Sequence, residues 1–298
     1  MKKYNKNSNR RDFLGKTMAL GISGMLGSSI TSTVNAKNMQ LRGMTSDDIS
    51  LAQWALVQEM RDGKWKNLDF PKIAREDFDL NGVELVNTLF EVPTASYLNQ
   101  LKRNADDHGV KLVLIMVDNE GDPCQPDKAE RRQFGINHRK WIDIAQYLGC
   151  SAIRTNCRGS KGVDKREGLK WAADSYNMLL EYAMKANIQV VIENHGGVSD
   201  DADWIVELMN EVDNLYFGTY PDWRDPEVGY DNVEYLRKML PWAVGMSYRN
   251  QPTEKQSAKM IEISRQAGYK GWYGIESSGR EEIKKGIKIL KKYLDLPN

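Results

Sequence analysis

Eight short segments rich in β-branched and aromatic residues recur along the chain, and a stretch with helical character follows each of them. The expected strands begin near Ile49, Gly82, Lys111, Ser151, Ile188, Leu215, Ala243 and Gly271. The expected helices cover residues 71–78, 96–107, 139–148, 167–186, 201–212, 231–240, 254–267 and 281–294. Regular alternation of strand and helix is typical of an α/β fold with a parallel sheet.

The size of the repeating unit narrows the choice of α/β fold. Units of roughly 27–40 residues, eight of them in succession, match a (β/α)8 barrel. An open, doubly wound sheet is the rival arrangement, but eight strands are many for it and no glycine-rich phosphate loop follows the first strand. We therefore predict a single (β/α)8 TIM barrel over residues 37–298, which a chain of 298 residues is long enough to form.

The first 36 residues have the features of an export signal. The sequence NRRDFLGK (9–16) resembles the twin-arginine motif, a Gly/Ser-rich stretch follows, and Val34-Asn35-Ala36 offers a small-residue cleavage site. The repeated Gly and Ser disfavour a permanent anchor, because a membrane-spanning helix needs about 20 mostly apolar residues. We expect a twin-arginine signal peptide at 1–36, export of the folded protein and a periplasmic location.

The stretch QVVIENHGG (189–197) is the strongest indication of a functional site. A run of Val and Ile predicts a strand buried on both faces, and polar residues follow at its carboxyl end, where α/β folds carry their chemistry. Because side chains alternate along a strand, Glu193 and His195 share one face. They are candidate metal ligands, and the alternative is a buried Glu–His pair that satisfies its own hydrogen bonds.

The carboxyl ends of three expected strands each contribute an acidic residue. Glu193 ends the fifth strand, Asp222 the sixth and Glu276 the eighth, so the barrel brings them to one side of its mouth. Three like charges at close range raise one another's pKa unless a cation lies between them. The pattern therefore indicates either a bound metal ion or a shared proton.

Charge and cysteine content exclude other classes. The chain has 42 basic and 41 acidic residues, a formal net charge of +1, so it has no basic field that would bind nucleic acid. A DNA-repair nuclease on the same barrel is disfavoured for this reason and because such sites need more histidine ligands. The three cysteines are odd in number and widely spaced, so they form no disulfide framework.

Several motifs resemble the sugar phosphate isomerase/epimerase group of the xylose isomerase-like barrels, in particular an exported branch of it. They are IENHGG (192–197), GTYPDW (218–223), AGYKGWYGIE (267–276) and the tail EEIKKGIKILKKYL (281–294). The resemblance implies a divalent cation held by Glu, Asp, His and Glu from strands five to eight. These positions fall on Glu193, Asp222 and Glu276.

The strand-7 histidine of that pattern has no counterpart here, because AVGMSYR offers Gly245 or Ser247 at its place. Two replacements are open: His195 swings in from strand five, or a water molecule fills the position. A carboxylate-rich site with one nitrogen suits Mn²⁺ or Mg²⁺ as cofactor.

The resemblance also implies a function. In the family, the two glutamates act as acid and base beside a carbonyl, so we expect a metal-dependent sugar isomerase or epimerase that works through an enediolate. Glu193, Glu276 and His195 are the expected catalytic residues. One alternative is a lyase that cleaves a 3-keto-glycoside by metal-assisted elimination, and another is a non-catalytic sugar-binding barrel. The expected partner is a sugar or glycoside; we expect neither nucleic acid nor a stable membrane anchor, and a homo-oligomer stays open.

Four further residues at strand exits are expected to contact the substrate: Trp54, Arg154, Asn156 and Arg249. For Arg154 a salt bridge to Glu193 or Glu84 is an equal alternative, and for Trp54 the alternative is packing at the rim. His138 is expected to open the helix HRKWIDIAQYLG, where it would be solvated, and His108 to cap a helix end.

Overall fold

All eight predicted strands form, and they run parallel in the order β6-β5-β4-β3-β2-β1-β8-β7. Their bounds are β1 (Ile49–Ala52), β2 (Gly82–Val86), β3 (Lys111–Met116), β4 (Ala152–Thr155), β5 (Gln189–Glu193), β6 (Phe217–Tyr220), β7 (Gly245–Tyr248) and β8 (Trp272–Ile275). Two isolated bridges, Thr219–Ala243 and Asp222–Ser247, join β6 to β7. The sheet therefore closes, or nearly closes, into a barrel.

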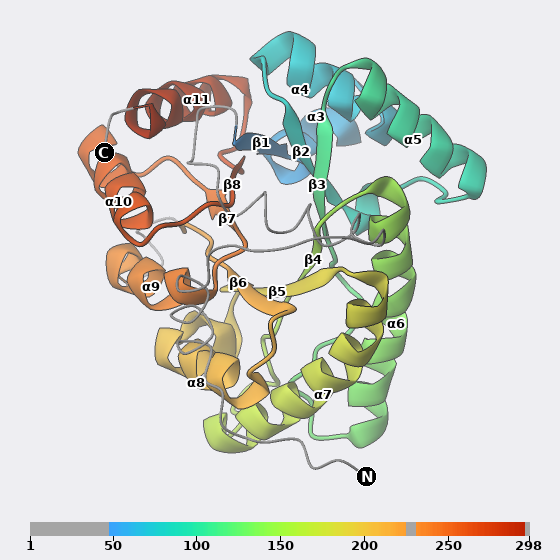
Figure 1. Cartoon of the computed structure of the whole chain (residues 1–298), viewed down its shortest axis with the longest axis vertical. Coiled ribbons are helices and arrows are strands. Elements are labelled where there is room, and N and C mark those ends of the chain that lie inside the picture. Colours follow the sequence, from blue (N-terminus) through green and yellow to red (C-terminus); the bar gives the residue numbers. More distant parts are fainter. Residues whose placement is uncertain (1–47, 225–230, 296–298) are drawn as a thin grey trace, which may run out of the picture. The chain divides into compact units, whose positions relative to one another are not determined.

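Helices surround the strands on the outside of the barrel (Figure 1). They are α3 (Val57–Arg61), α4 (Phe70–Phe78), α5 (Ala95–Asp107), α6 (Lys128–Leu148), α7 (Lys165–Ala186), α8 (Ala202–Val212), α9 (Asn232–Met239), α10 (Glu254–Gln266) and α11 (Arg280–Leu294). Short 3₁₀ turns add η1 (Gln53–Leu56), η2 (Asn67–Asp69), η3 (Asn87–Leu89), η4 (Gly197–Asp200) and η6 (Leu240–Trp242). The predicted (β/α)8 TIM barrel is confirmed.

The computed structural model describes residues 48–224 and 231–295, which belong to one unit, Gly43–Asn298. The predicted signal peptide at 1–36 lies outside the described residues. In the ranges that are described, no helix is both long and apolar enough to cross a membrane.

Local sequence explains where the helices begin and end. The first turns of α6, α7, α8 and α9 are each capped by an aspartate, namely Asp127, Asp164, Asp201 and Asp231, whose carboxylate accepts backbone N–H groups of that turn. Gly149 ends α6 with a φ of 79°, a left-handed conformation that glycine adopts without steric cost. The next strand can then start within a few residues.

Two local predictions are wrong. The first strand, expected to end near Trp54, ends at Ala52, because Gln53 turns into η1 and its side-chain oxygen accepts the N–H of Val86 on β2 at 2.7 Å. Helix α6 begins at Lys128 rather than at 139, because Asp127 caps it. His138 consequently lies in mid-helix, buried, with Nδ1 2.8 Å from the carbonyl oxygen of Phe134.

A carboxyl group lies in the middle of the barrel interior. Glu84 on β2 is fully buried and accepts hydrogen bonds from Ser50 Oγ, at 2.8 Å, and from the hydroxyl of Tyr220. Gly274 on β8 leaves room for it, since a Cβ there would lie 2.2 Å from Glu84 Oε2. Burial raises the pKa of Glu84 to about 7, although both hydrogen bonds act in the opposite direction.

This raised pKa makes stability depend on pH. Folded Glu84 keeps its proton up to about pH 7, whereas the unfolded chain loses it near 4.5, so the stabilisation is complete below 4.5 and is lost as the pH rises through 7. As the pH rises from 4.5 to 8, the wild type should lose about 3 kcal/mol of its free energy of unfolding through Glu84. Glu84→Gln should not show this loss, because glutamine does not titrate. Urea unfolding of metal-free protein at several pH values measures this. Glu262→Gln, on an exposed face of α10, is the control; equal slopes for all three proteins would contradict the assignment.

Candidate functional site

The candidate site continues the inward-facing rows of the barrel strands. Glu193 is the last residue of β5, Asp222 follows the inward-facing Tyr220 of β6 by two positions, and Glu276 follows β8 directly. All three are buried, with at most 6% of their surface exposed. The expected convergence of these strand ends at the barrel mouth is therefore what the structure shows.

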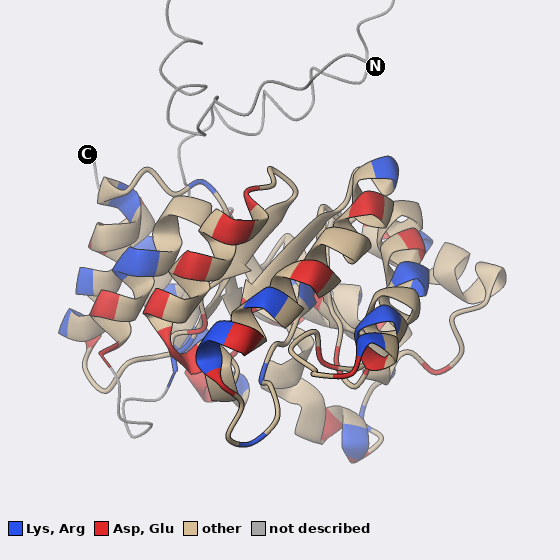
Figure 2. Cartoon of the chain, turned by 90° about the horizontal axis from the view of Figure 1, so that it is seen from below, with Lys and Arg blue, Asp and Glu red and all other residues tan. Residues whose placement is uncertain are grey.

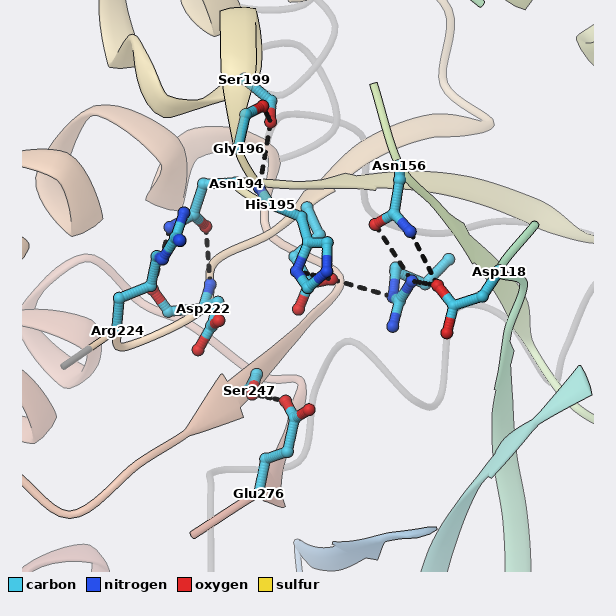
Figure 3. Close-up of polar contacts among 12 residues, drawn as sticks. Asp118, Asn156, Asn194, His195, Gly196, Ser199, Asp222, Arg224, Ser247 and Glu276 are labelled. Atoms are coloured by element: carbon cyan, nitrogen blue, oxygen red, sulfur yellow. Dashed lines mark hydrogen bonds and ion pairs between the residues drawn. The ribbon is translucent and has the colours of Figure 1, made fainter. Parts of the chain in front are cut away.

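Three side chains form a compact set of potential metal ligands. Among the described residues, one ligand atom each of Glu193, His195 and Asp222 can be chosen so that all lie within 4.8 Å of one another. His195 lies between Asp222 and the Asp118–Asn156 pair in the view of Figure 3. Its Nδ1 is 3.5 Å from Glu193 Oε2. His195 thus lies on the carboxylate side of the mouth, as one of the two predicted replacements for the missing strand-7 histidine requires.

Ser247 occupies the strand-7 position. The Asp222–Ser247 bridge joins the end of β6 to β7, with Ser247 N donating to the carbonyl oxygen of Pro221 at 2.9 Å. The Ser247 hydroxyl donates to Glu276, as the two labelled side chains in Figure 3 show. Glu276 is therefore held beside the three potential ligands but is not one of the set.

Two arginines lie among the carboxylates. Arg154 Nε is 3.1 Å from Glu193 Oε2, and its NH1 is 2.7 Å from Asp118 Oδ1. Arg249 joins the other two acids, with Nε 2.8 Å from Asp222 Oδ1 and NH2 3.2 Å from Glu276 Oε1.

These arginines supply part of the positive charge that we expected a metal ion or a shared proton to provide. The conclusion that only a metal ion or a shared proton could relieve the repulsion was incomplete, because guanidinium groups also contribute. Four carboxylates and two guanidinium groups meet, which leaves a net charge of −2 when all six are ionised: Asp118, Glu193, Asp222, Glu276, Arg154 and Arg249. One divalent cation would balance this charge.

The pKa values of the site residues show that the buried charges are only partly compensated. Burial, with Asp222 and Glu276 nearby, holds the pKa of Glu193 well above its usual range, although Arg154 opposes the shift. Burial likewise raises the pKa of Asp222 to about 6. Burial and then the positive charges of Arg154 and Arg158 lower the pKa of His195 to about 4, so its imidazole is neutral at neutral pH. A neutral imidazole is the form that binds metals.

Backbone contacts fix the orientation of these groups. Asn194 and Asp222 exchange two hydrogen bonds, from Asn194 Nδ2 to the Asp222 carbonyl at 3.0 Å and from Asp222 N to Asn194 Oδ1 at 2.7 Å. His195 N donates to Ser199 Oγ at 3.0 Å, and its carbonyl accepts from Arg158 Nε at 2.9 Å. Glycine is required at position 197, two residues after His195, since a Cβ there would lie 1.9 Å from the Arg158 carbonyl oxygen.

The donor set fits a divalent cation. It offers carboxylate oxygens and one imidazole nitrogen, a combination suited to hard or borderline ions. Glu193 Oε2 is buried and accepts no hydrogen bond of acceptable geometry, although it forms an ion pair with Arg154. The net charge of −2 on the six ionised groups also favours a divalent cation.

The other predicted site residues have different surroundings. Trp54 in η1 is half-buried and packs against the apolar residues of the barrel interior, so it borders the mouth. Arg154 is buried and takes the salt-bridge alternative with Glu193, not with Glu84. Asn156 Oδ1 accepts from Arg154 at 3.1 Å, so this amide already has a partner.

Sequence reasoning missed Asp118 as a site residue. It accepts hydrogen bonds from Arg154 and from Asn156 Nδ2, each at 2.7 Å. Burial acts to raise the pKa of Asp118, but Arg154 outweighs this and the pKa is lowered. Its even spacing from the inward-facing Leu114 and Met116 was the available signal.

Comparison with known proteins agrees with this fold. The family model described as "Xylose isomerase-like TIM barrel" matches residues 73–246. A search of curated proteins finds no match.

Three solved structures illustrate the structural likeness. A D-tagatose 3-epimerase-like protein is 17% identical, with a TM-score of 0.67 over 83% of this chain and 97% of that one. A probable 3-DHS dehydratase from Bacillus anthracis is 17% identical, with a TM-score of 0.63 over 83% of this chain and 98% of that one. A 3-keto-D-glucoside 4-epimerase from E. coli is 12% identical, with a TM-score of 0.62 over 77% of this chain and 94% of that one. At these identities the likeness shows the fold.

The role of Arg154 can be tested by stability. In Arg154→Met, Asp118 and Glu193 lose their counter-charge while buried, so we expect a loss of about 3–5 kcal/mol in the free energy of unfolding. The control is Lys285→Met, whose partner Glu282 and own side chain are about half exposed, with an expected change within about 0.5 kcal/mol. Equal stability of Arg154→Met and wild type in denaturant unfolding would show that Arg154 does not stabilise the buried carboxylates.

Proposed function

The chain belongs to the xylose isomerase-like TIM barrel family, and on that premise we propose that it is a metal-dependent isomerase or epimerase of sugars. The observation that carries the proposal is the close set formed by Glu193, His195 and Asp222, with Glu276 beside it. The D-tagatose 3-epimerase-like protein and the 3-keto-D-glucoside 4-epimerase share this fold and support the choice of substrate class.

Glu193, His195 and Asp222 would hold the cation, with Mn²⁺ or Mg²⁺ as the expected ion. When bound, such an ion supplies Lewis-acid stabilisation of negative charge on a sugar oxygen. Glu193, Asp222 and Glu276 are buried, which strengthens the charge interactions among them.

The proton transfers fall to the two glutamates. Glu193 approaches from β5 and Glu276 from β8, strands that are not neighbours in the barrel. One carboxylate takes a proton from the carbon beside the sugar carbonyl, and the other returns one to the opposite face, which is the requirement of an epimerase. Ser247 and Arg249 orient Glu276, while Arg154 orients Glu193.

The groups at the rim would orient the sugar. Trp54 offers an aromatic face against which a sugar ring can stack. Arg249, whose side chain is 31% exposed, is the polar group best placed to reach a hydroxyl, since Asn156 already bonds Arg154 and Asp118. We also propose, from residues 1–36 alone, that the protein is exported and acts in the periplasm.

The ligand role of His195 has a direct test. We expect His195→Gln to weaken Mn²⁺ binding by more than the roughly 10–100-fold that follows loss of a ligand's hydrogen-bond partner. Elemental analysis after dialysis against Mn²⁺, followed by titration, measures this. His108→Gln is the control, because His108 lies at the end of α5, next to the amino end of β3. Full metal content with lost turnover would make His195 a substrate or acid–base group instead.

The chemistry is tested by isotope exchange. In D₂O, we expect deuterium at the carbon beside the carbonyl of a turned-over keto sugar, because a glutamate exchanges its proton with solvent. Glu276→Gln should lower turnover by about 10²–10⁴-fold with substrate binding nearly unchanged. Glu281→Gln, in the first turn of α11, is the matched control.

Two results would change this assignment. Product without deuterium would indicate a hydride shift, and the glutamates would then be ligands only. Release of an alcohol or aglycone from a 3-keto-glycoside, together with exchange, would replace the isomerase with a lyase.

A further inference from the structure

We infer that Cys124 and Cys157, free thiols in this structure, are a disulfide site that joins two loops at the mouth of the barrel. Cys124 lies in the loop after β3, and Cys157 lies in the loop after β4. These strands are neighbours in the sheet, so their loops leave the same edge of the barrel. The bond does not depend on the proposed catalysis. Its presence in the cell follows from the proposed export, because disulfides persist in oxidising compartments.

One carboxylate holds the backbone beside both cysteines. Asp122 Oδ1 accepts the N–H of Cys124 at 2.8 Å. Asp122 Oδ2 accepts the N–H groups of Arg158 at 2.7 Å and of Gly159 at 3.1 Å, and these are the two residues that follow Cys157. The two loops are therefore fixed close to each other at the cysteines, which is the first requirement for a disulfide.

The side chain of Cys124 points toward the segment that follows β4. A Cβ on Gly159 would lie 3.1 Å from Cys124 Sγ, and this sulfur donates to the Gly168 carbonyl at 3.5 Å. The Cys157 thiol has the Cys124 side chain as its hydrogen-bond partner, and both residues are 0% exposed. Two thiols that already interact can be joined by small adjustments of their side chains.

The third cysteine has no access to this pair. Cys150 precedes β4 and Cys157 follows it, so they lie at opposite ends of that strand. Burial raises the pKa of the Cys150 thiol to about 12, with Lys111, the first residue of β3, acting against the shift. Cys150 thus lies near the amino ends of the strands, and pairing within the native fold is restricted to Cys124 with Cys157.

Formation of the bond requires an oxidant of the disulfide class. One cysteine attacks the external disulfide, and the other then displaces the resulting mixed disulfide. The two cysteine protons end on the two thiols released from the oxidant, which is thereby reduced. Burial raises the pKa of Cys157 well above its usual range, so thiolate attack is slow in the folded protein. We therefore expect the bond to form as the chain folds or when the two loops open.

The experiment refolds the full-length protein from urea with a mixture of oxidised and reduced glutathione, and in parallel with reduced glutathione alone. Basic and acidic residues are interspersed on the helices of Figure 2, so no strong field of one sign repels this charged oxidant. Of the three cysteines, we expect one free thiol in the denatured protein after oxidising refolding and three after reducing refolding. Peptide mapping should find Cys124 joined to Cys157.

The crosslinked protein should also unfold at a higher temperature. The bond closes a loop of about 30 residues in the unfolded chain, which should raise Tm by roughly 5–15 °C. Reduction of the unfolded protein with dithiothreitol, followed by refolding, should remove this increase.

Cys150→Ala is the matched control, because it leaves the pair intact and should form the same bond with the same increase in Tm. Cys157→Ala should form no bond at Cys124. Three free thiols in the wild type after oxidising refolding, a bond that includes Cys150, or a Tm no higher than that of the reduced protein overturns the inference. The wild-type peptide map decides the pairing even where Cys157→Ala does not fold. Because no readout uses metal content or turnover, failure of the proposed activity would leave this result intact.

Discussion

The compensation of buried carboxylates by a small number of positive charges is the constraint on which the site depends. Four acids meet at the mouth of the barrel, and each would lose much of its hydration there. Arg154 and Arg249 divide these acids into two groups, Asp118 with Glu193 and Asp222 with Glu276. Burial raises the pKa values of Glu193 and Asp222, and the neighbouring arginines offset this only in part. A divalent cation would complete the balance of charge.

The barrel interior accommodates large polar side chains below the site because glycines lie opposite them. The ring of Tyr220 crosses from β6 toward Glu84 on β2, and it fits because a Cβ on Gly245 would lie 2.9 Å from that ring. Gly274 makes the corresponding space for the Glu84 carboxyl. The layer beneath the site thus combines glycines with large polar side chains, whereas ordinary TIM barrels fill such layers with branched apolar residues.

The sequence was sufficient for the fold and for the residues that follow strand periodicity. Glu193 and His195 could be placed on one face because a strand alternates with a period of two. Asp118 was harder, because the polar run Asp118-Asn119-Glu120 bends at once, with a φ of 62° at Asn119, and the period ends there. The early start of α6 was missed because the segment GDPCQPDK reads as a loop, although Asp127 within it caps the helix.

The positions of long side chains were the other feature that could not be predicted from the sequence. The sequence places Arg249 at the exit of β7, but it does not specify whether its guanidinium extends to solvent or turns back between Asp222 and Glu276. A long side chain chooses between such positions by the charges it finds, and those come from three strands that are distant in sequence. The same holds for Arg154, for which both outcomes were open.

Strand β7 carries Ser247 where the family resemblance implied a histidine. With Ser247 at that position, Glu276 receives a hydroxyl and a guanidinium as partners, and it lies outside the compact ligand set. The proposed nitrogen ligand is instead His195, two residues beyond Glu193, the last residue of β5. With His195 as its nitrogen donor, the proposed site keeps one imidazole beside its carboxylates. Glu193 lies among the proposed ligands and also contacts Arg154, while Glu276 has both oxygens close to groups that orient it, which suits the proton transfers proposed for the two glutamates.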